Sequence, residues 1–121
     1  MTNDLNILVN RYIDAWNETD GARRRELVAA TWTEDGTYLD PLMSGNRHDS
    51  IATMIGLAQE RFPDHRFELS FGPDAHNDRV RFAWRLYGPE GDAPVATGVD
   101  FGVVAEDGRL RSVTGFLESP A

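Results

Sequence analysis

The sequence has no cysteine among its 121 residues, and this absence removes several kinds of site at once. A disulfide framework, a thiol nucleophile and a thiolate metal site all need cysteine. Long apolar runs are also missing, because no stretch approaches the roughly 18 residues of a membrane-spanning helix, and no signal peptide is recognisable. We therefore expect a cytoplasmic protein that does not contact a membrane.

Positive charge is scarce, with 12 Lys and Arg against 20 Asp and Glu and a formal net charge of −8. Such a chain repels phosphate backbones, so a nucleic-acid partner is not expected. An uncharged or apolar small molecule meets no such barrier. The three histidines, His48, His65 and His76, lack the paired spacing of metal ligands, and we expect no metal site.

The length predicts one domain over residues 1–121, with a single core. The composition, 40% hydrophobic and 26% charged, is that of a globular protein. Apolar residues three and four apart predict helices over 5–16, 21–32 and 51–62. Alternating patterns then predict strands over 66–71, 79–87, 95–104 and 109–117, joined by segments rich in Gly, Pro, Asn and Asp. Helices first and strands last predict an α+β fold.

The segment 37–42, TYLDPL, places a carboxylate in an otherwise apolar and aromatic run. Because side chains alternate along an extended segment, Tyr38, Asp40 and Leu42 share one side of it. Pro41 favours the end of a short or edge strand, between turns predicted at 34–36 and 44–46. An inward-facing Asp40 would have a raised pKa and could serve as a base near neutral pH.

The strand predicted over 95–104 has two different faces. One face carries Asp100 among small residues, Ala96, Gly98 and Gly102, which would leave space around an inward carboxyl and so predict a pocket. The opposite face is apolar, with Phe101 and several valines. An apolar outer face predicts that a second subunit covers it, so we expect a homodimer through the outer face of the sheet.

Three segments together resemble the nuclear-transport-factor-2-like (NTF2-like), or SnoaL-like, superfamily, and within it ketosteroid isomerase. Tyr12 in the first helix is similar to an oxyanion-binding tyrosine. The segment 34–41 is similar to the one that ends in a catalytic Asp-Pro, here Asp40. The segment 98–101 is similar to the strand with a second oxyanion acid, here Asp100. The resemblance implies a cone-shaped fold in which three helices and a curved antiparallel or mixed sheet enclose an apolar pocket.

The same resemblance implies proton abstraction next to a carbonyl group. Asp40 would be the general base, and Tyr12 with a protonated Asp100 would donate hydrogen bonds to the enolate oxygen. No cofactor is implied, and the ligand would be a small hydrophobic molecule. The apolar wall that binds it is predicted to comprise Trp16, Trp32, Met54, Phe67, Phe82, Trp84 and Phe116.

Two departures limit the resemblance. Trp32 and Ile55 stand where ketosteroid isomerase has further tyrosines that support the oxyanion tyrosine, which argues against true steroid isomerisation. Arg85 lacks the second acid of the Asp-Arg-Asp arrangement in related epoxide hydrolases, since Tyr87 stands there. Two alternatives stay open: a SnoaL-like polyketide cyclase, in which Asp100 could be the base, and a non-catalytic protein that binds a hydrophobic ligand.

Overall fold

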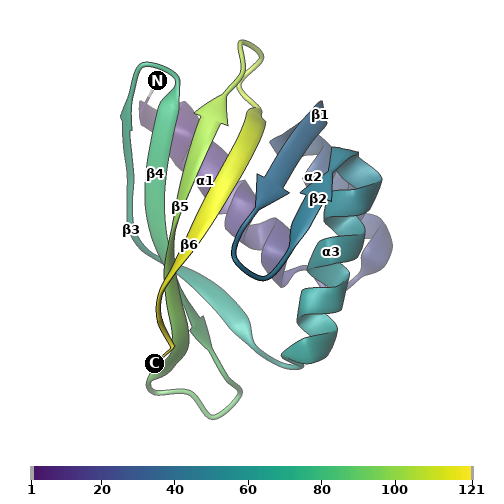
Figure 1. Ribbon diagram of the computed structural model, residues 1–121, viewed down its shortest axis with the longest axis vertical. Helices are drawn as coiled ribbons and strands as arrows, with labels where there is room; N and C mark the ends of the chain where they lie inside the picture. Colours follow the sequence, from purple (N-terminus) through teal and green to yellow (C-terminus); the bar gives the residue numbers. More distant parts are fainter. Residues whose placement is uncertain (1, 121) are drawn as a thin grey trace.

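The computed structural model describes residues 2–120, with side chains described for residues 4–118, so the ends of the predicted domain, residues 1 and 121, lie outside it. Three helices, α1 (Thr2–Asn17), α2 (Gly21–Thr31) and α3 (Arg47–Arg61), pack against one six-stranded sheet (Figure 1). The α+β expectation is confirmed. Within the described residues, no helix is long and apolar enough to cross a membrane.

The sheet is mixed, with the strand order β2-β1-β6-β5-β4-β3. Its strands are β1 (Trp32–Leu39), β2 (Ser44–Asn46), β3 (Arg66–His76), β4 (Arg79–Tyr87), β5 (Pro94–Val104) and β6 (Leu110–Pro120). Neighbouring strands are antiparallel except β1 and β6, which run parallel. Helix α3 packs on β1 and β2, and α1 packs against β3, so the helices cover one face of the sheet.

Two turn predictions around Asp40 are wrong. Residues 44–46 form β2, which pairs with β1 in the register Leu39↔Ser44, so β2 and not β1 is the edge strand. Residues 34–36 lie inside β1, where the pairing with β6 shifts register between Trp32 and Thr37. Strand pairing overrides local turn propensity in both places, because residues 44–46 pair with β1 and residues 34–36 lie between positions of β1 that pair with β6.

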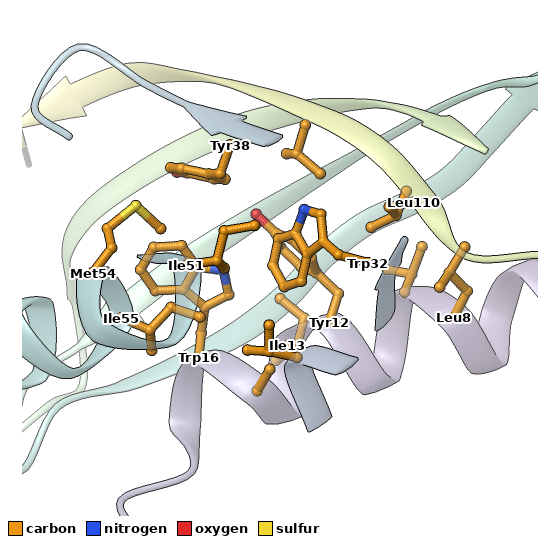
Figure 2. Packing of buried hydrophobic residues seen from close by; sticks show 14 of the residues in the cluster. Leu8, Tyr12, Ile13, Trp16, Trp32, Tyr38, Ile51, Met54, Ile55 and Leu110 are labelled. Carbon is orange, nitrogen blue, oxygen red and sulfur yellow. The ribbon is translucent and has the colours of Figure 1, made fainter. Parts of the chain in front are cut away.

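The core lies between the helices and the sheet. The predicted apolar face of α1 is confirmed, since Leu8, Val9, Tyr12, Ile13 and Trp16 are all buried. Figure 2 shows how Tyr12 and Trp16 of α1 meet aromatic residues of β1 and aliphatic residues of α3. Burial of these side chains is the main favourable term that holds the helices on the sheet.

The opposite face of the sheet carries an exposed apolar patch, formed by Leu39, Phe71, Phe101 and Phe116. Cross-strand pairing puts Phe71 and Phe116 on one face, because Phe71 pairs with Ala83, which pairs with Val99, which pairs with Phe116. Leu39 and Phe101 lie on the same face, since both pair with Thr114. An ion pair between Arg81 and Asp74 lies on the same face. A two-fold interface uses one patch twice, and a patch with both charge signs does not repel its own copy. A homodimer through this face therefore stays our proposal.

We predict that Phe101→Asp converts a dimer into a monomer, because each copy would place one new carboxylate, and the dimer two, in an apolar interface. Sedimentation equilibrium at micromolar concentration measures the mass. Leu57→Asp is the matched control, since Leu57 is exposed to a similar extent but belongs to α3. A wild-type protein with the mass of one chain would contradict the proposed dimer.

Candidate active site

A cavity of about 130 Å³ lies between the helices and the sheet, and the three predicted catalytic residues all line it. Tyr12 comes from the buried face of α1, Asp40 from the residue after β1, and Asp100 from the inward face of β5. The structure brings these three side chains to one cavity, although Tyr12 and Asp100 are 88 positions apart in the sequence. Their chemical roles stay predictions.

Asp100 is the buried polar group of this cavity, with only 2% of its surface exposed. The Tyr12 hydroxyl donates a hydrogen bond to Asp100 Oδ2 at 2.5 Å. The Trp84 indole N–H donates to Asp100 Oδ1 at 3.1 Å. Both carboxyl oxygens therefore have a donor, which is what a carboxyl group at this depth needs.

Burial governs the ionisation of this pair. Desolvation raises the pKa of Asp100 from its ordinary 3.8 to about 6, against the hydrogen bonds from Tyr12 and Trp84, which lower it, while the nearby Asp40 raises it slightly. Burial, followed by the charge of Asp100, raises the pKa of the Tyr12 phenol well above its usual 10. Tyr12 therefore stays protonated, whereas Asp100 titrates near neutral pH.

Asp40 sits in a different environment, half-buried in the turn after β1. Its Oδ1 accepts hydrogen bonds from the backbone N–H groups of Leu42 and Met43 at 2.8 and 2.9 Å. Its Oδ2 accepts one from the Tyr38 hydroxyl at 2.5 Å. These donors fix the carboxylate at the cavity wall.

Tyr38 and Gly115 belong to the site, although the sequence prediction assigned neither to it. Gly115 of β6 pairs with Asp100, and a Cβ added there would lie 2.8 Å from Asp100 Oδ1, 3.2 Å from the Tyr38 hydroxyl and 3.2 Å from Asp40 Cβ. The two acids and Tyr38 thus approach the same point, which only glycine leaves free. The sequence offers a signal for Tyr38, because alternation places it on the same side of the strand as Asp40. It offers none for Gly115, whose place beside Asp100 depends on the register of β5 with β6.

The small residues predicted to leave space beside Asp100 behave differently, since Ala96 lines the cavity whereas Gly98 and Gly102 leave no empty space. A Cβ on Gly98 would lie 2.3 Å from the Trp84 ring, and one on Gly102 would lie 2.8 Å from a Leu110 methyl carbon. These glycines instead let larger neighbours lie against the strand. At Gly98 this close approach carries the indole across β5, where its N–H reaches Asp100.

The predicted apolar wall is partly wrong. Trp16, Phe67 and Trp84 line the cavity, whereas Trp32, Met54 and Phe82 lie in the core and do not. Phe116 is 53% exposed and packs edge-on against Phe101 on the outer face, because its partner in the sheet is Val99 and not Asp100. Periodicity had given no information about which face of β6 points inward.

Trp32 and Ile55, which stand in place of the supporting tyrosines, are also buried in the core. Neither residue donates a hydrogen bond to Tyr12, since the isoleucine side chain has no polar group and the Trp32 indole Nε1 has no hydrogen-bond partner among the described residues. The described residues contain no group of three or more His, Asp or Glu side chains placed to hold a metal ion.

Comparisons with known proteins agree with this fold. Residues 9–113 match the family described as the SnoaL-like domain. A solved structure from Agrobacterium tumefaciens str. C58, named there as a SnoaL-like family protein and provisionally as an isomerase, shares 44% identity over 98% of this chain and 100% of that chain, with a TM-score of 0.91. No curated protein matches.

More distant structures share the fold. A protein of unknown function with a cystatin-like fold from Methylobium petroleophilum PM1 is 18% identical over 100% of this chain and 80% of that chain, with a TM-score of 0.78. A protein from Sinorhizobium meliloti, provisionally named a polyketide cyclase, is 17% identical over 95% of this chain and 98% of that chain, with a TM-score of 0.71. The expected NTF2-like arrangement of helices and sheet is thereby confirmed.

The raised pKa of Asp100 predicts how stability depends on pH. Between about pH 4 and pH 6 the folded protein holds a proton on Asp100 that the unfolded chain has released, so the free energy of unfolding falls as pH rises through about 6. Asp100→Asn lacks this term. We predict that its stability relative to wild type increases by about 2 kcal/mol from pH 4 to pH 7, since one pKa unit corresponds to about 1.4 kcal/mol and the unfolded carboxyl is already about half ionised at pH 4. Urea denaturation at both pH values measures it, and a constant difference would contradict the buried, titrating carboxyl.

Proposed function

Because the chain belongs to the SnoaL-like domain family, we propose that it is an isomerase-type enzyme that moves a proton next to the carbonyl group of a hydrophobic small molecule. The observation that carries this proposal is the Tyr12–Asp100 pair, held at 2.5 Å in an apolar cavity beside a second carboxylate. Two carboxyl groups in different environments can take opposite roles in acid–base chemistry. The provisional isomerase name of the A. tumefaciens relative supports the same reaction class.

Asp40 is the proposed general base. Backbone N–H groups hold Oδ1, and the Tyr38 hydroxyl occupies one lone pair of Oδ2, so the second lone pair of Oδ2 stays available. This oxygen takes the proton from the carbon next to the carbonyl group. The C–H electron pair forms the enolate double bond, and the carbonyl oxygen gains the negative charge. The protonated Asp40 then returns the proton to the far carbon of the conjugated system, which regenerates the carboxylate.

Tyr12 and a protonated Asp100 are the proposed donors to the enolate oxygen. The protonated pair carries two O–H hydrogens, of which one lies between Tyr12 and Asp100 and the other can be donated to substrate. When Asp100 is ionised, a single hydrogen is shared within the pair and none is left. A donor in a dry apolar cavity stabilises the developing oxyanion more than it would in water.

A second candidate reverses the roles of the two acids. The Tyr12 hydroxyl and the Trp84 indole both donate to Asp100, which favours its charged form, and a pKa of about 6 suits a base near neutral pH. In this reading Asp100 forms the enolate, which then makes a carbon–carbon bond, as in a polyketide cyclase. The third reading, a cavity that binds a ligand without reaction, predicts that neither acid affects any turnover.

Replacement of the proposed base tests the isomerase reading. We predict that Asp40→Asn lowers kcat for isomerisation of a β,γ-unsaturated ketone by about 10²–10⁴-fold, the usual contribution of a general base. Formation of the conjugated product is followed by its ultraviolet absorbance. Asp35→Asn is the control, because Asp35 is exposed on β1 and bonds to Thr33. Equal activity of Asp40→Asn and wild type would remove Asp40 from the mechanism.

The pH profile separates the two roles of Asp100. If Asp100 donates, kcat/KM falls as pH rises through about 6; if it is the base, kcat/KM rises over the same interval. Trp84→Phe removes an N–H that stabilises the charged carboxylate, so it should move the inflection to higher pH in either case. An inflection that stays in place in Trp84→Phe would mean that another group titrates.

A further inference from the structure

The size of the cavity restricts what it can enclose. Its volume is about 130 Å³. An apolar protein cavity of about 150 Å³ holds one benzene molecule. Leu42, Phe62 and Leu117 line the cavity and are also exposed, so they form its mouth. A ligand with several fused rings would have to displace these side chains or lie outside them.

The wall of the cavity resists expansion on one side. Four rings form a continuous arc, with centroid distances of 5.3 Å from Tyr38 to Trp16, 5.4 Å from Trp16 to Phe67 and 5.3 Å from Phe67 to Trp84. Each ring is thus held by the next. A wall of close-packed rings keeps its shape and offers flat surfaces to a ligand.

Hydrogen bonds anchor this aromatic arc. The Asn17 side-chain amide accepts from the Phe67 backbone N–H at 2.7 Å and donates to the Phe67 carbonyl oxygen at 2.9 Å. The Gln59 amide donates to the Trp16 carbonyl oxygen at 2.9 Å. Trp84 is fixed by its bond to Asp100. Widening the cavity on this side would break several of these bonds at once.

The charge of the lining disfavours anions. Asp40 and Asp100 both line the cavity, and within the described part of the chain no Arg or Lys does. A carboxylate or phosphate group on the ligand would enter an apolar space beside two acids, with His65 as the one basic residue of the described lining, which is costly. An anionic ligand is therefore disfavoured.

From these three properties we infer that the substrate is a small, flat, uncharged carbonyl compound of about one ring, such as a monocyclic enone, and not a polycyclic one. Its carbonyl oxygen faces the Tyr12–Asp100 pair, and its ring lies along the aromatic arc. This inference rests on the proposed function, because it names the substrate class of the same site.

Binding of phenols tests the ligand class without requiring turnover, because a phenol is a flat, neutral mimic of the enol. Phenol, 2-naphthol, estradiol and 4-hydroxybenzoate are titrated at pH 7 by calorimetry, with the Trp84 indole N–H signal in NMR reporting the site. We expect phenol to bind at least about 10-fold more tightly than 2-naphthol, although naphthol is more hydrophobic, and estradiol not to bind. The anionic 4-hydroxybenzoate should bind at least about 10-fold more weakly than phenol.

Two variants test the volume directly. Met43→Ala enlarges the cavity and should raise the affinity for 2-naphthol relative to phenol, whereas Ala96→Leu fills it and should weaken phenol binding by at least about 10-fold. Phe116→Ala is the control, because Phe116 is exposed on the outer face of the sheet. An unchanged naphthol-to-phenol ratio in Met43→Ala together with unchanged phenol binding in Ala96→Leu would overturn the inference.

Failure of the ligand class and failure of the proposed function give different results. Estradiol that binds as tightly as phenol, or 4-hydroxybenzoate that does, contradicts the small uncharged ligand whatever the protein catalyses. Binding in the expected order without isomerisation of 3-cyclohexen-1-one supports the ligand class and contradicts the proposed reaction. Isomerisation of 3-cyclohexen-1-one at a higher kcat/KM than that of a β,γ-unsaturated steroid ketone supports both.

Discussion

The hydrogen bond between Tyr12 and Asp100 is the interaction on which the rest of the site depends. It joins α1 to β5 and places a carboxyl group in an interior where an unpaired one would be very costly. Trp84 supplies the second donor, and it can do so only because Gly98 has no side chain in the path of the indole. Tyr12 of α1, Trp84 of β4 and Gly98 of β5 thus together satisfy the hydrogen bonds of one buried carboxyl group. Such a group is tolerated at the expense of stability, as is common where activity requires a tuned carboxyl.

The two acids differ because their surroundings differ. Asp100 is deeply buried and paired with side-chain donors, whereas Asp40 is half-buried and held mainly by backbone N–H groups of its own turn. Gly115 lies beside both acids, and because it has no side chain it leaves the space between them free. Backbone donors fix a carboxylate in one orientation, while a buried pair shares a proton whose position responds to pH. This contrast gives one small cavity an acid held in one orientation by its own turn and a deeply buried acid whose pKa burial raises.

Much of this arrangement could be predicted from the sequence, and the rest depends on strand pairing. The apolar spacing in α1 predicts that Tyr12 points inward, and alternation in β5 predicts the same for Asp100. The parallel pairing of β1 with β6 could not be predicted, because its residues lie far apart in the chain and each strand has weak local signals. The error at residues 34–36 lies in that pairing, the error at 44–46 follows from the pairing of β1 with β2, and the error at Phe116 and the unassigned role of Gly115 follow from the register of β5 with β6.

The parallel pair of β1 and β6 also has a consequence for folding kinetics. The turn that carries Asp40 is held beside Asp100 through β6, which contains Gly115. Helix α3 and the strands β2 to β5 lie between β1 and β6 in the sequence, and closing so long a loop is slow. The two acids therefore come together only when this long-range pairing forms.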